Sequence, residues 1–275
     1  MQTHTCKSCG TSFSGNYCNQ CGEKVIRQED RKLKHFLGEF INAITFADNK
    51  LFRTVKTILI APGRLSADFV EGKRKKYMKP ISIFFLANLI YFLFPVFNTF
   101  NTNLHLQMNA FPFLHSDLAT EMVNSRLEES GETLESFSLR YDSKSTELSK
   151  LLLILISLFQ AMFFWMIHSR NSKRFFSDHI IVSLELMSFI ILFCIQVLGL
   201  AFLLIASINS SFISELVTSG VMFSLILYYL YRVEFTFYST GGIRAFANAM
   251  LGSIAFSLFI FIYRSLLFFI TFWSL

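Results

Sequence analysis

Charged residues are scarce in this chain of 275 residues, and their scarcity limits the classes of protein to which it can belong. Asp, Glu, Lys and Arg make up only 16% of the sequence, against about 25% in ordinary soluble domains. Apolar residues make up 53%, with 34 Phe, and the mean hydropathy is +0.47. A soluble chain of this length could not cover several apolar stretches of about 20 residues with a polar shell. The composition therefore excludes an ordinary soluble globular protein and favours burial in a bilayer.

Sequence motifs for common chemistry are absent as well. The chain has no Gly-rich phosphate loop, no Gly-x-Ser-x-Gly and no His-Glu-x-x-His. No internal repeat stands out, which weakens the case for an inverted-repeat transporter. The first 30 residues are polar and lack the apolar core of a signal peptide, so we expect the first apolar span to act as the targeting signal. Enzymatic activity stays open but is the less favoured interpretation.

Long apolar runs are what the chain does contain. A helix of about 20 residues crosses a hydrocarbon core of about 30 Å. The sequence therefore predicts an all-α membrane protein with about five transmembrane helices, the third of which must tilt, kink or protrude. These spans are expected at residues 80–98, 151–169, 179–208, 212–232 and 245–271. The predicted order of domains is a zinc ribbon at 1–26, basic amphipathic helices at 31–79, the first span at 80–98, an acidic exterior loop at 99–150 and a bundle of four spans at 151–275.

Charge is distributed unevenly along the chain. Residues 1–79 hold 15 Lys and Arg against 7 Asp and Glu, whereas residues 99–150 hold 4 against 8. Because positive flanks stay on the cytoplasmic side of a membrane, we expect a cytoplasmic N-terminus and an exterior C-terminus. A basic head on an apolar body favours contact with anionic lipid over nucleic acid. Within the exterior loop we expect a helix that is capped by Ser116 and interrupted at Gly131.

Four of the five cysteines stand close together near the N-terminus, in the pattern Cys-x2-Cys-x8-Cys-x2-Cys with a glycine after each pair. Four thiolates at this spacing suit a tetrahedral zinc ion, and each glycine can adopt the positive φ that turns the backbone toward the sulfurs. Phe13 and Tyr17 are the only evident core residues, so metal binding would supply most of the folding free energy. The predicted ligands are Cys6, Cys9, Cys18 and Cys21.

Disulfides and a redox Cys-x-x-Cys are the competing interpretations of these cysteines. Disulfides need an oxidising compartment, which the predicted cytoplasmic N-terminus does not offer, and a redox pair usually lies in a βαβ context that is missing here. A closed set of four thiolates leaves no open position for a substrate. The zinc is therefore expected to be structural or to support binding of a protein partner. Cys194 lies in an apolar run and is expected only to pack.

The segment between the cysteines and the first span is amphipathic and basic. Apolar residues recur at helical spacing in residues 33–44, a second such helix stops at Pro62-Gly63, and a third covers 64–72. These helices either lie in the membrane interface or form a small soluble bundle. Lys73 and Arg74 begin a basic run that continues to Lys79. The run orients the first span and can bind anionic headgroups.

Ionisable residues within the apolar spans are candidates for function because their burial in a bilayer is costly. By depth in the membrane, we expect Glu185 to pair with Arg232 or Arg244, and Glu215 to pair with Arg264. Such charges either hold the helices together or snorkel to the interface, line a route for protons, ions or substrate, or take part in catalysis. The candidates are Asp178, His179, Glu185, Glu215, Arg232, Arg244 and Arg264.

Several of these motifs together resemble an uncharacterised bacterial family of polytopic membrane proteins with an N-terminal zinc ribbon, a domain of unknown function. The resemblance rests on the doubled Cys-x-x-Cys-Gly, on Pro62-Gly63, on the run from Gly72-Lys73-Arg74 through Tyr77 to Pro80, and on residues 178–189. It implies a bacterial inner membrane as the location and gives no activity. Where a second histidine often occurs in the family, this chain has Glu185.

Three functions are compatible with these features. The favoured one is a membrane anchor or scaffold whose zinc ribbon docks a cytoplasmic protein. The second is a small transporter or channel that uses Asp178, Glu185 and Arg264. The third is a membrane enzyme that acts on a lipid-linked substrate through Lys73, Arg74 and His179. The expected partners are the bilayer, a protein at the ribbon, anionic lipid and further copies of the chain, with nucleic acid disfavoured.

Overall fold

The computed structural model describes two separate compact units, Met1–Lys50 and Leu51–Leu275. The residues it describes are 3–23, 25, 49–97, 99–109, 115–169, 174–208 and 215–275, without the side chains of residues 206, 208, 215 and 216. The amphipathic helix predicted at 33–44 lies outside these residues.

The described residues of the first unit form a small β-hairpin and turns. Strand β1 (Thr3–Thr5) pairs antiparallel with β2 (Ser12–Ser14), with His4 opposite Phe13. Phe13 is buried together with Cys6 and Cys18. The described residues of this unit thus offer few apolar groups for a core, and a metal bound by the cysteines would add to its stability.

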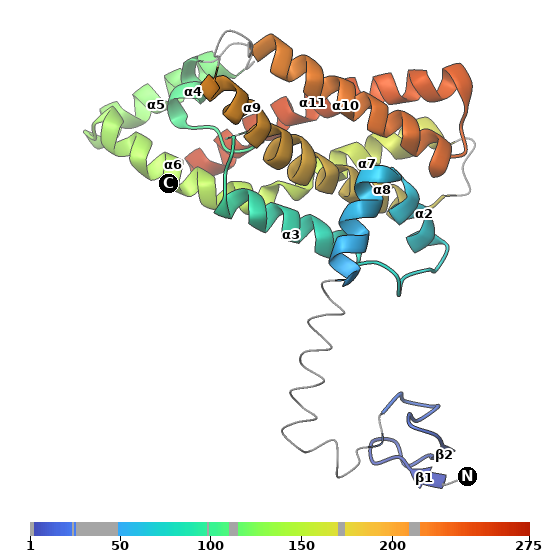
Figure 1. Cartoon of the computed structure of the whole chain (residues 1–275). Coiled ribbons are helices and arrows are strands. Elements are labelled where there is room, and N and C mark those ends of the chain that lie inside the picture. The colour runs from blue at the N-terminus through green and yellow to red at the C-terminus, as the bar shows by residue number, and fades with distance from the viewer. Residues whose placement is uncertain are drawn as a thin grey trace. The chain divides into compact units, whose positions relative to one another are not determined.

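The second unit is helical throughout most of its described residues, and Figure 1 shows its helices packed into one bundle. Residues 49–60 are helical and precede a turn at Pro62-Gly63, as the sequence predicts. The remaining elements are α2 (Arg64–Val70), α3 (Pro80–Leu93), α4 (Leu104–Asn109), α5 (Ser116–Ser130), α6 (Leu134–Leu152), α7 (Ile154–His168), α8 (Phe176–Phe189), η2 (Ile190–Val197), α9 (Leu198–Ile208), α10 (Glu215–Thr236) and α11 (Gly242–Trp273).

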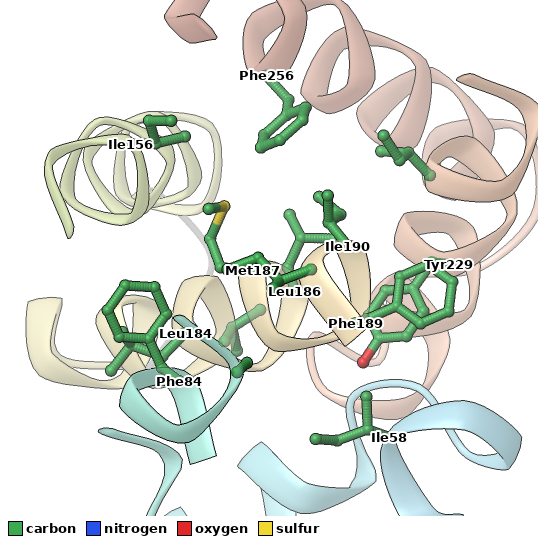
Figure 2. Packing of buried hydrophobic residues seen from close by; sticks show 14 of the residues in the cluster. Ile58, Phe84, Ile156, Leu184, Leu186, Met187, Phe189, Ile190, Tyr229 and Phe256 are labelled. Atoms are coloured by element: carbon green, nitrogen blue, oxygen red, sulfur yellow. The ribbon is translucent and has the colours of Figure 1, made fainter. Parts of the chain in front are cut away.

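The helix α8 lies at the centre of the bundle and continues without a break into η2 and α9. It packs against α2, α3 and α7, while α11 packs against α6, α7 and α10. Figure 2 shows the core around α8, where Leu186 and Met187 are fully buried and Phe189 stacks on Tyr229 of α10. Ten of the fourteen residues of α8 are buried, including every residue from Val182 to Phe189, which fits its central place.

Two helices in the described part of the chain are long and apolar enough to cross a membrane, Phe176–Ile205 and Gly242–Trp273. The helices α6 and α7 would together make a third, although they meet at a bend of 40°. The five predicted spans are therefore not supported. Two predicted spans fail for different physical reasons. The helix α3 has 14 residues and measures about 21 Å, which is shorter than a hydrocarbon core is thick. The helix α10 carries the charges of Arg232 and Glu234 near its C-terminal end, Thr236.

Residues 99–150, predicted as an acidic exterior loop, are largely helical where they are described. The helix α5 begins at Ser116 and ends before Gly131, which has a φ of 66°. The predicted interruption of the helix at Gly131 is therefore confirmed. The residue before the helix is His115, one position earlier than the predicted cap. Phe137 and Tyr141 of α6 are buried against Phe268 of α11, which ties these helices to the bundle.

Candidate functional site

The four N-terminal cysteines form the clearest candidate site. Their sulfur atoms all lie within 4.8 Å of one another, with 3.4 Å between Cys6 and Cys21 and 3.6 Å between Cys9 and Cys18. Sulfurs at the corners of a tetrahedron around zinc lie about 3.8 Å apart, whereas sulfurs in a disulfide lie about 2 Å apart. The four thiols therefore form a set that could hold one metal ion.

Two equivalent backbone turns bring these cysteines together. The amide of Gly10 donates to the carbonyl of Cys6, and the amide of Gly22 donates to that of Cys18, each at 2.9 Å. Gly10 and Gly22 have φ values of 75° and 77°, the left-handed conformation that glycine adopts most readily. The sequence prediction for both glycines is confirmed. Tyr17, predicted as a core residue, is exposed at 61%, and Phe13 alone of the two is buried.

In the helical unit, the carboxylate of Glu185 is fully buried and is bound by the turn that precedes and begins α2. The amides of Gly63 and Ser66 donate to its two oxygens at 2.9 and 2.8 Å. The hydroxyl of Ser66 donates to one oxygen, and that of Tyr229 donates to the other at 3.1 Å. Because hydrogen bonds satisfy both carboxylate oxygens, Glu185 needs no cation beside it.

The predicted pairing of Glu185 with Arg232 or Arg244 is therefore wrong. Both arginines are exposed, on α10 and α11, and the bonding partners of the carboxylate are Gly63, Ser66 and Tyr229. The carboxylate instead links α8 to a turn about 120 residues earlier in the chain. It acts as a clamp between two helices.

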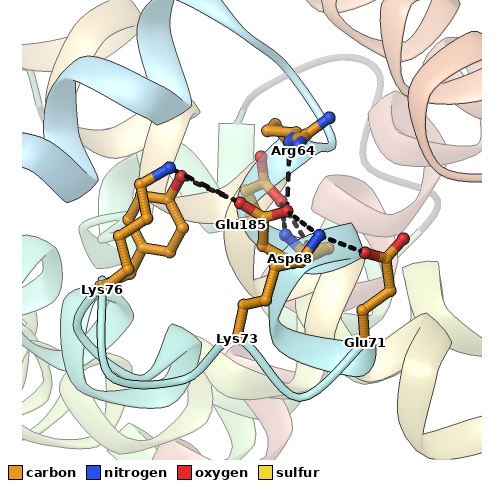
Figure 3. Close-up of polar contacts among 8 residues, drawn as sticks. Arg64, Asp68, Glu71, Lys73, Lys76 and Glu185 are labelled. Carbon is orange, nitrogen blue, oxygen red and sulfur yellow. Dashed lines mark hydrogen bonds and ion pairs between the residues drawn. The ribbon is translucent and has the colours of Figure 1, made fainter.

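Asp68 of α2 is a second buried carboxylate and has cations around it. Arg64 lies at 3.1 Å, Lys73 at 3.6 Å and Lys76 at 3.9 Å from its oxygens, and the hydroxyl of Tyr77 donates to it at 3.0 Å (Figure 3). Burial acts to raise the pKa of this carboxyl, but the hydrogen bond and the three cations outweigh it, so the pKa of Asp68 lies below its ordinary value. Two residues of the basic run, Lys73 and Lys76, thus contact the same buried carboxylate as Arg64.

The rest of the basic run stays at the surface. Arg74 donates to the carbonyl of Phe69 and lies over its ring at 4.9 Å, and Lys73 also contacts Glu71 at 2.7 Å. Between residues 64 and 79 the chain carries six Lys and Arg against Asp68 and Glu71, a net charge of +4. This surface keeps a positive excess even after the buried anion is counted.

At one end of the bundle, Asp178 and His179 lie within a polar cluster. The amide of Phe175 donates to the carboxylate of Asp178 at 3.0 Å, which caps the start of α8. The Nδ1 atom of His179 lies 2.8 Å from the hydroxyl of Tyr238. Both side chains therefore form hydrogen bonds to other residues of the protein.

The same cluster holds two residues that are not among the candidates predicted from the sequence, His168 and Glu234. The Nε2 atom of His168 lies 3.1 Å from the carboxylate of Glu234, and Asn248 donates to that carboxylate at 3.1 Å. The ring of His168 stacks on Tyr238 with centroids 3.6 Å apart. Their only signal in the sequence is a polar residue near the end of each of two apolar helices, α7 and α10.

Arg264 is half-buried in α11, where its guanidinium donates to the carbonyl of Thr99, with Nη2 at 2.6 Å. The backbone carbonyl of Arg264 accepts from Gln107 at 3.2 Å. The predicted partner, Glu215, has a side chain outside the described residues, and that pairing stays a prediction. Arg264 therefore ties α11 to the segment between α3 and α4.

The chemistry available in these clusters differs. The cysteine set offers four soft ligands that suit a metal such as zinc. Glu185, Arg264 and the His168–Glu234 pair each make bonds within the protein, which is typical of groups that hold helices together. In the described residues, the cysteines alone form a cluster of metal-ligating side chains that could hold an ion.

Comparison with known proteins adds one relation. Residues 48–92 match a family described as Protein of unknown function (DUF3667). No curated protein and no solved structure is significantly similar to the chain. The matched segment includes Gly63, Ser66 and Asp68, so the part of the chain that is similar to this family is the part that clamps Glu185 and carries the basic run.

Proposed function

We propose that this chain is a membrane-anchored docking protein, in which the helical unit lies in the bilayer and the cysteine unit binds structural zinc and recruits a cytoplasmic protein. The observation that carries the proposal is the closed set of four cysteine sulfurs on a compact unit of its own. Four thiolate ligands leave no position for a substrate. A zinc site of this kind shapes a small binding surface.

The bonding of the charged groups in the helices supports an anchor over a transporter. Asp178 accepts from a backbone amide, Glu185 accepts from two, and Arg264 donates to a backbone carbonyl. Groups that carry ions or protons face a water-filled path or one another. An enzyme that uses His179 has less support too, because that side chain is almost fully buried beside Tyr238.

We further propose a bacterial inner membrane with the cysteine unit on the cytoplasmic side. The excess of Lys and Arg in residues 1–79 supports this orientation, and a reducing compartment keeps the thiols available to zinc. The positive surface at residues 64–79 would lie against anionic headgroups of the same leaflet.

Zinc-dependent capture of partner proteins tests this function. Full-length protein carrying an affinity tag is crosslinked in native membranes and purified, and its companions are quantified by mass spectrometry. We expect a companion protein that is enriched with the wild type and with Cys194→Ala, and that is lost with Cys9→Ser/Cys21→Ser. The same companions with all three forms would contradict a docking role for the cysteine unit.

A further inference from the structure

A partly open cavity of about 510 Å³ lies in the helical unit, among η2, α10, α11 and the segment that follows α3. Its volume falls in the range of small-molecule binding sites. Ten of the fourteen described residues that line it are apolar, and none is charged. Its apolar lining includes Ile190, Ile195, Met222, Ile226, Phe256 and Ile260.

The π-helical conformation of η2 shapes one wall of the cavity. A π-helix closes hydrogen bonds between residues five apart, which widens the turn and brings residues four and five apart onto one side. Ile190, Cys194 and Ile195 have this spacing, and all three line the cavity. Such insertions occur frequently at functional sites. Phe256 of α11 contributes to the opposite side, and Figure 2 shows Ile190 and Phe256 on their two helices.

Two of the polar groups at the cavity wall, the hydroxyl of Ser257 and the carbonyl of Thr99, form hydrogen bonds within the protein. The hydroxyl of Ser257 donates to the carbonyl of Ser253 at 3.1 Å, and the carbonyl of Thr99 accepts from Arg264. These groups therefore place no demand for a polar partner on an occupant. The wall as a whole resembles hydrocarbon, and an apolar occupant fits it best.

The surroundings of the cavity indicate where the occupant comes from. Its walls include η2 and α11, which belong to the two helices long and apolar enough to cross a membrane. Exposed apolar side chains stand directly beside lining residues, with Val221 next to Met222 and Leu258 next to Ser257. In a bilayer these side chains would be in contact with acyl chains.

We propose that this cavity binds one acyl chain of a membrane lipid. The cavity is partly open at the surface of the helical unit, so a hydrocarbon chain can enter it from the side. An inserted chain gains van der Waals contacts with the apolar wall without burying a polar group. The site is independent of the cysteine unit and of any protein partner.

Photocrosslinking tests the proposal. Full-length protein is produced in cells fed with a palmitic acid analogue that carries a diazirine, is purified in detergent and illuminated, and the crosslinked residues are mapped by mass spectrometry. We expect crosslinks to concentrate on lining residues such as Met222 and Ile260. Crosslinks spread evenly over exposed positions such as Leu204 and Leu258 would overturn the proposal.

Variants that change the cavity volume sharpen the result. Ile226→Trp fills the cavity and is expected to lower crosslinking at the lining residues several-fold, whereas Leu258→Trp, on an exposed position of α11, leaves it unchanged. Ile226→Ala enlarges the cavity and is expected to keep or raise the yield, which supports the proposal even where the Trp variant fails to fold. Equal yields in the Trp and Ala variants at position 226 would exclude a chain bound in this space.

Discussion

The carboxylate of Glu185 shows how a costly group is accommodated inside an apolar helix. Both of its oxygens accept a backbone N–H, one from Gly63 and the other from Ser66. A buried carboxylate with this many donors contributes to the fold, whereas the same group without them would destabilise it. Glu185 is thus a structural link between α8 and the segment that is similar to the family of unknown function.

Replacing Glu185 by Gln tests this link. The amide NH2 of glutamine cannot accept a hydrogen bond, so one backbone N–H would face another donor in a buried site. We expect a loss of about 1–3 kcal/mol of stability, measured as a lower thermal midpoint in detergent. The control Glu147→Gln, which changes an exposed ion pair with Lys144, is expected to have little effect. An unchanged midpoint in Glu185→Gln would refute the clamp.

Asp68 gives the stability a dependence on pH. Its native pKa lies below the ordinary value of 3.8, so the folded state holds its proton less tightly than the unfolded state. The stability that it contributes is full above a pH of about 3.8 and is lost as the pH falls through the lower native pKa.

The comparison of wild type with Asp68→Asn measures that contribution. We expect the wild type to have the higher thermal midpoint at neutral pH and the difference to shrink below a pH of about 3.8. Glu71→Gln, which changes an exposed partner of Lys73, serves as the control. A difference that persists or grows in acid would show that the ion pairs around Asp68 do not act through its charge.

Helix junctions depend on a few residues with special conformations. Gly63 has a φ of 79°, and a Cβ atom placed there would lie 3.2 Å from the Cα of Val233 in α10. The turn before α2 therefore needs glycine for its backbone conformation and for its close approach to α10. This turn also presents the amide that binds Glu185.

Gly63→Ala is expected to cost about 1–2 kcal/mol from the left-handed backbone alone, and more where α10 has to move. Gly220→Ala provides the control, because that position lies within α10 and a Cβ atom added there would meet no described atom within 4 Å. The control should be neutral or stabilising by about 0.5–1 kcal/mol. The measurement is the thermal midpoint of each variant in detergent. Equal midpoints for Gly63→Ala and Gly220→Ala would contradict the close approach of Gly63 to α10.

Local sequence predicts local geometry well in this protein. The cysteine turns with their two glycines follow from neighbours fewer than six residues apart, and α5 with its stop at Gly131 does too. Contacts between distant segments are harder to predict. Nothing in the residues around Glu185 indicates that amides about 120 positions away will bind it. Likewise, His168 and Glu234 meet only because the C-terminal ends of α7 and α10 lie close together.

The number of spans shows a related limit. Hydropathy indicates which runs are apolar but not how long the helix will be, and α3 stops at Leu93 after 14 residues. Two helices remain that could cross a bilayer in the described part of the chain, or three with the bent pair α6 and α7, where the sequence predicts five. Burial of α3 against α8 explains why so apolar a segment can be short: part of its surface is covered by protein.

The whole chain combines a helical body suited to a bilayer with a small unit whose four cysteines could hold a metal ion. The proposed function requires that one molecule both is inserted in the membrane and carries a metal on its cysteines. In the function that we propose, the helical body fixes the location of the protein, and the metal stabilises the small unit.

The zinc content of the full-length protein in membranes washed with alkaline carbonate tests this combination most directly. Zinc is measured per chain after purification from the washed membranes, with Cys9→Ser/Cys21→Ser for comparison. We predict one zinc ion per chain in the wild type and none in the variant, with both proteins kept in the membrane fraction. A chain that the wash releases, or a membrane-bound wild type without zinc, would contradict the account.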